Sequence, residues 1–256
     1  MTIAYKGISV SYSDAGTGAP LILLHGFLEN KTMWQPFIPT LSKTHRVVCV
    51  DLLGHGNTEC LGYIHTMEAM AEAVKAVITR LKIEKATFVG HSMGGYVALA
   101  FAEKNPEMVS SLCLMNSTCL PDTEEKKINR DRAIEAVKQN HKTFIRLSIN
   151  NLFMPENRSL FTQDIEQVIA EAMKIPLQGI VAALEGMKIR QDRLHVFKNS
   201  SFNKTMIIGK NDPVLNYESL IEQAETAQAP YTLFNDGHMS HIENKQALLE
   251  LISILP

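Results

Sequence analysis

A serine at position 92 lies in the segment "GHSMGG" (90–95), between an apolar run typical of a strand and a stretch with helical spacing. A serine at a tight strand-to-helix turn projects its hydroxyl above the edge of the sheet, where it can act as a nucleophile. Such a turn is strained and crowded, and Gly90 and Gly94 leave room in it because they have no Cβ. The helix that follows would aim its N-terminal amides at the reacting centre. The segment therefore predicts a nucleophile elbow at Ser92.

Two later segments supply the base and the acid that a serine nucleophile needs. A neutral serine reacts poorly unless a histidine takes its proton, and the histidine needs a carboxylate to orient it. Asp212 follows the apolar run in "MIIGKNDPVL", and His238 follows the one in "YTLFNDGHMSHIEN". Open α/β sheets build their sites beyond the carboxyl ends of the strands. We therefore expect Ser92, Asp212 and His238 to form a catalytic triad.

Other residues near these positions could take the same roles. His241 lies in the same loop as His238, but we expect it to begin the next helix. Asp236 is too close in sequence to His238 to be its orienting acid. An acid could instead follow the strand that ends at residue 115, but that position is Asn116. The prediction is therefore His238 with Asp212, and His241 is the alternative base.

The segment "LLHGFLEN" (23–30) places a turn after another apolar run, at the same edge of the predicted sheet. A tetrahedral intermediate needs two hydrogen-bond donors aimed at its oxyanion. We expect these donors to be the backbone N–H groups of Phe27 and Met93. His25, His55 and His91 each lie beside a glycine in a turn, and we expect them to have structural roles.

Several short, continuous apolar runs indicate strands that are covered on both faces, as in parallel sheets. Helical spacing appears between them, for example over 67–81 and 247–255, so the chain predicts a doubly wound α/β sheet. Residues 120–200 contain no good strand and read as several amphipathic helices. We expect them to form a helical cap, or lid, inserted into a core domain made of residues 1–119 and 201–256.

Composition excludes several classes of function. The chain of 256 residues has 25 basic and 27 acidic residues, and no Lys/Arg run suggests nucleic-acid binding. No apolar stretch is long enough to span a bilayer, and the N-terminal residues lack the pattern of a secretion signal. The four cysteines form no CxxC pair, as is typical of free thiols in a reducing compartment. We therefore expect a cytoplasmic protein with neither a nucleic-acid nor a membrane partner.

Taken together, these segments resemble the α/β-hydrolase superfamily. The resemblance rests on "HGF" at 25–27, "DLLGHG" at 51–56, "GHSMGG" at 90–95, "GKND" at 209–212 and "DGHMSHIEN" at 236–244. It implies the α/β-hydrolase fold, with a mostly parallel eight-stranded sheet and a helical cap after the sixth strand. It also implies that the protein needs no organic cofactor and no metal.

The chain departs from the residue patterns of several branches of this superfamily, and these departures argue against membership of those branches. Epoxide hydrolases and haloalkane dehalogenases of this superfamily use an aspartate nucleophile, whereas this chain has Ser92. The carbon–carbon hydrolases of menaquinone synthesis carry an arginine where this chain has Tyr96, although Arg146 or Arg158 could still bind a carboxylate. Cofactor-free perhydrolases carry a proline in the loop that follows "HG", where this chain has Phe27.

These residues predict a serine esterase that cleaves carboxylic esters of small to medium apolar acyl groups through an acyl-enzyme. Its partner would be a small-molecule ester, and a homodimer is left open. The alternative is a C–C bond or thioester hydrolase with the same triad, which would need a cation in its pocket. A third hypothesis, from another class, is a ligand sensor that keeps the triad but turns over slowly.

Overall fold

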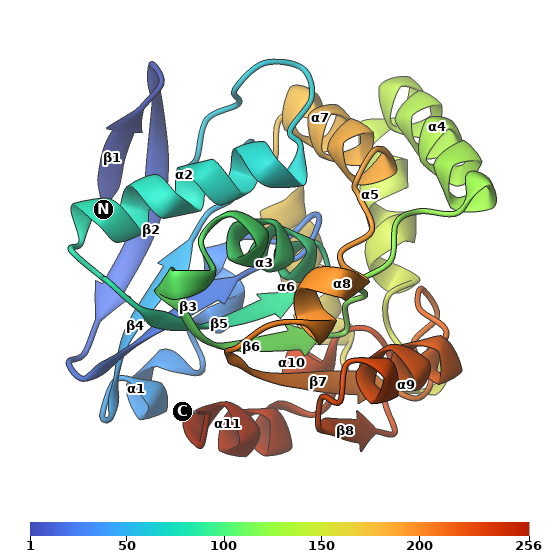
Figure 1. The fold of residues 1–256 in the computed structure, drawn as a ribbon. Coiled ribbons are helices and arrows are strands. Elements are labelled where there is room, and N and C mark those ends of the chain that lie inside the picture. Colours follow the sequence, from blue (N-terminus) through green and yellow to red (C-terminus); the bar gives the residue numbers. More distant parts are fainter. Residues whose placement is uncertain (256) are drawn as a thin grey trace.

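The computed structural model describes residues 1–255 and contains one eight-stranded sheet with helices on both faces (Figure 1). The strand order is β1-β2-β4-β3-β5-β6-β7-β8. The strands are β1 Thr2–Tyr5, β2 Ile8–Ala15, β3 Ala19–Leu24, β4 His45–Val50, β5 Ala86–His91, β6 Val109–Met115, β7 Asn203–Gly209 and β8 Tyr231–Phe234. β1 and β2 pair antiparallel, as do β2 and β4, and all other neighbours run parallel. The predicted fold class is confirmed.

The central strands are apolar throughout because both of their faces are covered. In β3, Leu21 and Leu23 face one layer of the core, while Ile22 and Leu24 face the other, and all four are fully buried. Side chains alternate between the two faces of a strand, so a strand between two layers must be apolar at every position.

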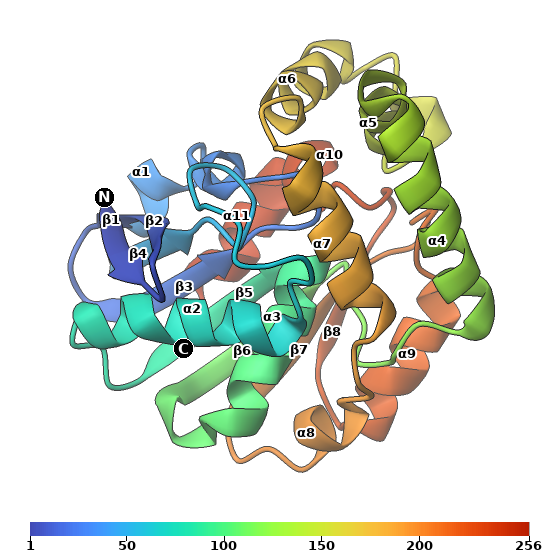
Figure 2. The same cartoon turned by 90° about the horizontal axis from the view of Figure 1, so that it is seen from above.

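Helices supply the two outer layers (Figures 1 and 2). One layer contains α2 Met67–Arg80 and α3 Met93–Lys104, and the other contains α1 Ile38–Leu41 and α11 Lys245–Ser253. The remaining core elements are η1 Lys31–Trp34, η2 Pro106–Met108, α9 Tyr217–Thr226 and α10 Ser240–Glu243. The predicted alternation of strands and helices therefore holds along the core.

Between β6 and β7 the described chain is helical, as the sequence predicts. It forms α4 Glu124–Gln139, α5 His141–Asn150, η3 Pro155–Asn157, α6 Thr162–Ala172, α7 Leu177–Lys188 and α8 Leu194–Lys198. Figure 2 shows α4, α5, α6 and α7 on one side of the molecule, away from β1 and β2. We refer to residues 120–200 as the inserted segment, and its role as a cap stays a prediction.

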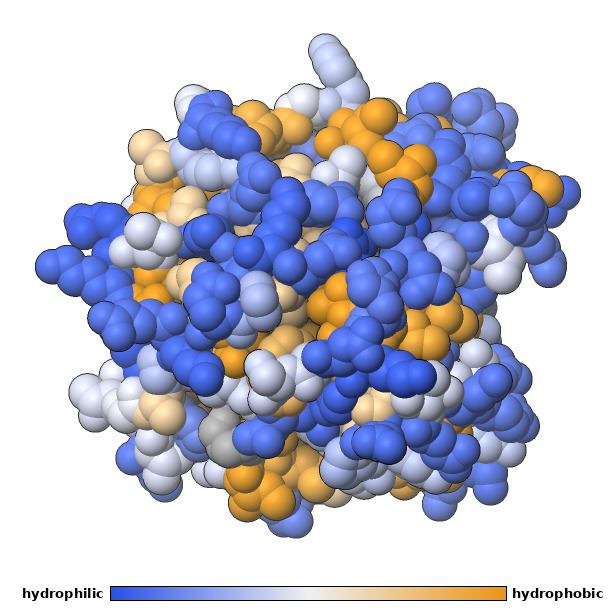
Figure 3. All heavy atoms as spheres, viewed as in Figure 1, coloured by the Kyte–Doolittle hydropathy of each residue, from blue (hydrophilic) through white to orange (hydrophobic). Residues whose placement is uncertain are grey.

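Apolar side chains on the face shown in Figure 3 form small separate groups within a mostly hydrophilic surface. Among residues 1–255, no single helix is long and apolar enough to cross a membrane. Helices α6 and α7 meet that criterion only as a pair, and they are bent by 99° relative to each other.

Candidate active site

Ser92 lies at the turn between β5 and α3, as the sequence predicts. Its backbone has φ 50° and ψ −115°, a sparsely populated conformation for a residue with a side chain. A Cβ at Gly90 would lie 2.5 Å from the carbonyl oxygen of Gly94, and one at Gly94 would lie 2.5 Å from that of Leu24. Only glycine fits at these two positions, so the sequence around Ser92 follows from the sharpness of the turn.

Asp212 and His238 meet in a direct contact from two loops that follow β7 and β8. The Nδ1 of His238 lies 2.6 Å from Oδ2 of Asp212, and both side chains are buried. The other carboxylate oxygen of Asp212 accepts the backbone N–H groups of Val214 at 2.8 Å and Leu215 at 3.0 Å. Burial alone would raise the pKa of Asp212, but His238 and these amides outweigh it and hold the pKa below its usual value.

The contact with Asp212 fixes the chemistry of the other ring nitrogen of His238. When Nδ1–H donates to the carboxylate, Nε2 carries the lone pair that a general base needs. Within residues 1–255 the Nε2 of His238 forms no hydrogen bond, so it is free to accept a proton. The hydrogen bond between this nitrogen and Oγ of Ser92 is therefore not formed here, and such catalytic hydrogen bonds often tighten only when substrate binds.

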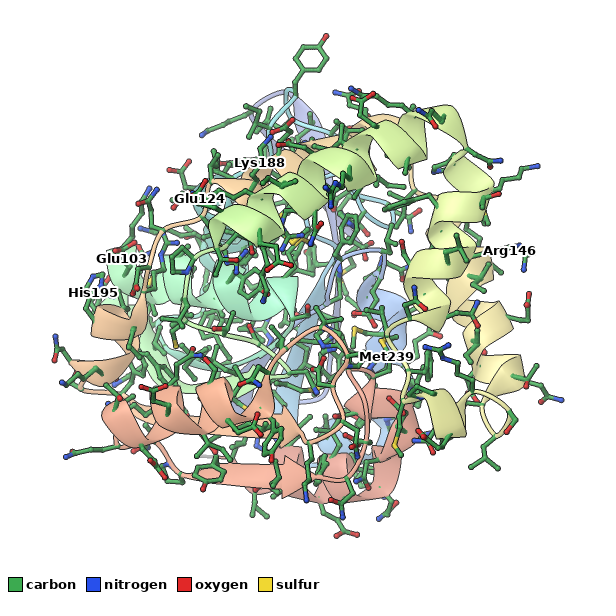
Figure 4. All side chains as sticks on the ribbon, turned by 90° about the vertical axis from the view of Figure 1, so that its right-hand side faces the viewer. Glu103, Glu124, Arg146, Lys188, His195 and Met239 are labelled. Carbon is green, nitrogen blue, oxygen red and sulfur yellow. The ribbon has the colours of Figure 1, made fainter. Side chains whose placement is uncertain are left out.

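The loop of His238 is held from the inserted segment as well as from the core. The backbone N–H of His238 donates to the carbonyl of Leu152 at 2.9 Å. Glu243 accepts the backbone N–H of Met154 at 3.1 Å and the side-chain amide of Asn157 at 2.8 Å. In Figure 4, Met239 lies on the side of the molecule where α5 and α6 stand. The position of His238 therefore depends on how the inserted segment docks.

The rival residues have other partners. Asn116 donates to the carbonyl of Gly237 at 3.1 Å and approaches Asp212 at 3.4 Å, so it supports the pair from the position where an acid could have been. Asp236 accepts the hydroxyl of Ser240 at 3.2 Å, and burial raises its pKa to about 7. His241 lies 3.3 Å from Glu29.

The turn at Gly26 and Phe27 is held from behind by His25. Nδ1 of His25 bonds to the carbonyl of Gly26 at 2.8 Å, and its Nε2 accepts the backbone N–H of Leu52 at 2.9 Å. Within residues 1–255, the backbone N–H groups of Phe27 and Met93 enter no hydrogen bond. They are therefore free to act as donors to a ligand.

The sequence analysis did not find a second buried cluster, which lies beside this turn. It consists of Glu29, His91 and His241. Oε2 of Glu29 lies 2.6 Å from Nδ1 of His91 and accepts the backbone N–H of Gly26 at 2.8 Å. The other ring nitrogen of His91 lies 3.0 Å from the carbonyl oxygen of His238. A signal existed, since an acid three residues after Gly26 in a buried loop needs a partner.

The same cluster is where a metal ion could be held among the described residues. Glu29, His91 and His241 each offer one ligand atom, and these atoms lie within 4.8 Å of one another. However, Oε2 of Glu29 and Nδ1 of His91 already bond to each other. A metal would have to replace that hydrogen bond.

A cavity of about 270 Å³ lies between the loop after Phe27 and helix α6. Its apolar wall includes Leu28, Met33, Phe161, Val168 and Ile242. Glu29 and His241 also line it, so the cavity adjoins the buried cluster.

Comparison with known proteins places the fold and the sequence in one family. A family model for the alpha/beta hydrolase fold matches residues 19–245. The structure of a thermophilic esterase from Thermogutta terrifontis, solved with malate bound, is similar with a TM-score of 0.91. The two chains are 31% identical, over 98% of this chain and 94% of the esterase.

The matches to curated sequences are lower in identity or cover a smaller part of the chain. The (E)-2-((N-methylformamido)methylene)succinate hydrolase of Acinetobacter baylyi is 27% identical over 242 residues, which cover 90% of this chain and 88% of that enzyme. Uncharacterized proteins of Mycobacterium bovis and Mycobacterium tuberculosis are 34% identical over 111 residues. The chain spans only 33% of the length of those mycobacterial proteins, and the match covers 43% of this chain.

Proposed function

We propose that this chain, which belongs to the alpha/beta hydrolase family, is a serine hydrolase that cleaves carboxylic esters. The observation that carries the proposal is the buried contact of 2.6 Å between Asp212 and His238, which leaves Nε2 of His238 unbonded. Ser92 stands at the same carboxyl edge of the sheet, in the strained turn that exposes a nucleophile.

In the first half of the proposed reaction, Oγ of Ser92 attacks the ester carbonyl carbon while Nε2 of His238 takes the hydroxyl proton. Asp212 stabilises the imidazolium that results. The negative charge that develops on the carbonyl oxygen is bound by the N–H groups of Phe27 and Met93. The tetrahedral intermediate then collapses, and His238 gives its proton to the departing alcohol.

The second half repeats these steps with water. His238 takes a proton from a water molecule as the oxygen attacks the acyl-enzyme carbonyl. The carbon–oxygen bond to Ser92 breaks, the carboxylic acid leaves, and the proton returns from His238 to the serine. No other group needs to change its protonation state.

We assign the acyl group of the substrate to the cavity beside the oxyanion turn. This cavity begins at Leu28, one residue after the donor at Phe27, and more of its exposed wall surface is apolar than polar, although Asp164 and Glu171 also line it. A volume of about 270 Å³ suits a small to medium acyl chain. Arg146, one of the cap cations that could bind an acid, is exposed and pairs with Glu166 at 3.3 Å. These features favour neutral, apolar acyl groups.

A second candidate is a hydrolase, including a C–C bond hydrolase, for substrates that carry a carboxylate. The observation that favours it is Arg158, whose Nε is buried without a hydrogen-bond partner. Arg158 does not line the cavity, so an acidic substrate would have to extend beyond it to satisfy this nitrogen. The relatives named for a succinate derivative and solved with malate bound fit the same idea.

The test is hydrolysis of p-nitrophenyl esters of increasing acyl length, with wild type beside Ser92→Ala. Turnover that requires Ser92 and is highest for short or medium chains supports the esterase. Labelling of Ser92 by a fluorophosphonate without ester turnover would show a working nucleophile and the wrong substrate class. Monoesters of dicarboxylic acids, tested on wild type and Arg158→Gln, then address the second candidate.

A substitution in the cavity wall tests whether the acyl group binds there. Val168 lines the cavity from α6, and Val168→Trp would fill much of it. We expect the preferred acyl chain to become shorter, with little change in the rate for acetate. An unchanged chain-length profile would place the acyl group elsewhere.

A further inference from the structure

Glu29 connects three segments that the proposed reaction depends on. Its Oε2 accepts the backbone N–H of Gly26, which lies directly before the donor at Phe27. The same oxygen bonds His91, the residue before Ser92, and Nε2 of His91 bonds the backbone carbonyl of His238. One buried carboxylate thereby ties the oxyanion turn to the elbow and, through one ring, to the loop of the base.

Both nitrogens of His91 face oxygen acceptors, and this determines its protonation. An imidazole with one proton can donate only once, so both bonds form only when the ring is the imidazolium. Burial alone would lower the pKa of His91, but the facing carboxylate of Glu29 outweighs it and raises the pKa above its usual value. The pKa of Glu29 is held well below its usual range despite burial, because His91 faces it.

The third member of the cluster stays neutral. Burial lowers the pKa of His241 to about 4, so at neutral pH His241 carries no charge against His91. The ion pair is therefore Glu29 with His91, fully enclosed, with side-chain exposures of 3% and 1%. A short charge-assisted bond in such surroundings is stiff and holds its partners closely.

We propose that Glu29 is a positioning residue that acts through His91. It holds the Phe27 donor and the His238 base in the correct position relative to Ser92. This rests on the proposed function, because the segments it aligns are those that supply the nucleophile, the donor and the base. Displacement of a reacting group by about 1 Å can reduce the rate about 10²-fold, which sets the size of the expected effect.

The decisive variant is Glu29→Gln, which keeps the shape of the side chain and removes its charge. We expect kcat for the best p-nitrophenyl ester to fall about 10- to 100-fold, with KM changed less than about threefold. Rates are expressed per active site titrated with a fluorophosphonate, so that unfolded protein does not count.

The matched control is Asp122→Asn, another buried carboxylate that pairs with a buried cation. Asp122 pairs with Arg190 and Arg130, and within residues 1–255 no hydrogen bond or ion pair joins it to the three segments. We expect it to lower the melting temperature as much as Glu29→Gln does, while kcat per titrated site stays within about twofold. Equal kcat losses in the two variants would reduce Glu29 to a structural role and overturn the proposal.

A double-mutant cycle tests whether Glu29 acts through His91. If it does, Glu29→Gln combined with His91→Gln loses no more kcat than the worse single variant. Additive losses would contradict the proposed route.

The rate of fluorophosphonate labelling separates this proposal from the choice of substrate. Labelling needs the nucleophile, base and oxyanion donors but no particular ester, so Glu29→Gln should slow it to a similar extent. Wild type that is not labelled at Ser92 would overturn the proposed function itself. Normal labelling of Glu29→Gln would overturn only the role of Glu29.

Discussion

The two buried carboxylate–histidine pairs, Asp212–His238 and Glu29–His91, have the same contact but differ in their second ring nitrogen. In each pair, Nδ1 of the histidine lies 2.6 Å from a carboxylate oxygen, and the two rings are 5.1 Å apart. Nε2 of His238 forms no hydrogen bond among residues 1–255, whereas Nε2 of His91 bonds a carbonyl oxygen. An unbonded nitrogen can accept a proton from a reacting group, whereas a nitrogen that donates to a backbone carbonyl holds that neighbour in place.

The first prediction concerns Oγ of Ser92, the group whose proton Nε2 of His238 would accept. Ser92→Ala should reduce kcat about 10⁶-fold, because without Oγ the base has no nucleophile to activate. The fold should remain, since the hydroxyl of Ser92 has no structural hydrogen bond within residues 1–255. Ester hydrolysis and the melting temperature check both statements, and near-wild-type turnover would reject Ser92 as nucleophile.

Changing the acid of the first pair should have the next largest effect. Asp212→Asn keeps the size of the side chain but favours the wrong tautomer of His238 and removes the charge that stabilises the imidazolium. We expect kcat to fall about 10⁴-fold, far more than for Glu29→Gln, because only the first pair exchanges a proton with substrate. Similar losses in the two variants, measured side by side, would erase the distinction between the pairs.

The alternative base gives a smaller effect. His238→Asn should lose about as much activity as Ser92→Ala, because it removes the base itself, whereas His241→Asn should lose less than about tenfold. Within residues 1–255, His241 pairs with Glu29 but hydrogen-bonds neither Asp212 nor the carbonyl of His238. Kinetics of both variants decide the matter, and a greater loss in His241→Asn would transfer the role of base to His241.

The smallest effect is a pH dependence of stability that belongs to the Glu29–His91 pair. The raised pKa of His91 adds stability below its unfolded value of about 6.5, and this is lost as pH rises through the folded pKa. The lowered pKa of Glu29 adds stability above about pH 4.3, which is lost as pH falls through the folded pKa. Together, the pair contributes most between about pH 5 and 6.5.

Urea unfolding of wild type and Glu29→Gln measures this contribution directly. We expect a difference in the free energy of unfolding of about 3 kcal/mol near pH 5.5, and a smaller difference at pH 9. His241, which also faces Glu29, is neutral at both pH values because its pKa is lowered to about 4, and burial likewise lowers the pKa of His25. A difference that does not change with pH would mean that the pair is not ionised.

Much of the candidate site could be predicted because its parts are local. The turn at Ser92 needs glycines at fixed spacing, and the loops of Asp212 and His238 directly follow the apolar runs that form β7 and β8. Parallel strands present their carboxyl ends at one edge, so three segments far apart in sequence could be assigned to one site. Asn116 could likewise be recognised as a position that lacks the acid, although not as a donor beside Asp212.

The sequence could show that Glu29 needs a partner but not which one, because Glu29 and His91 are 62 residues apart and neither belongs to a motif that names the other. The sequence by itself determined the sheet, the strained elbow and the order of the candidate nucleophile, acid and base, since strand burial and turn geometry act over a few residues. Only the tertiary structure decided how the inserted segment meets the His238 loop and which partner, if any, the second nitrogen of each imidazole bonds. Those outcomes depend on which acceptors packing brings within 3 Å of a ring, and no local rule of chain geometry specifies that.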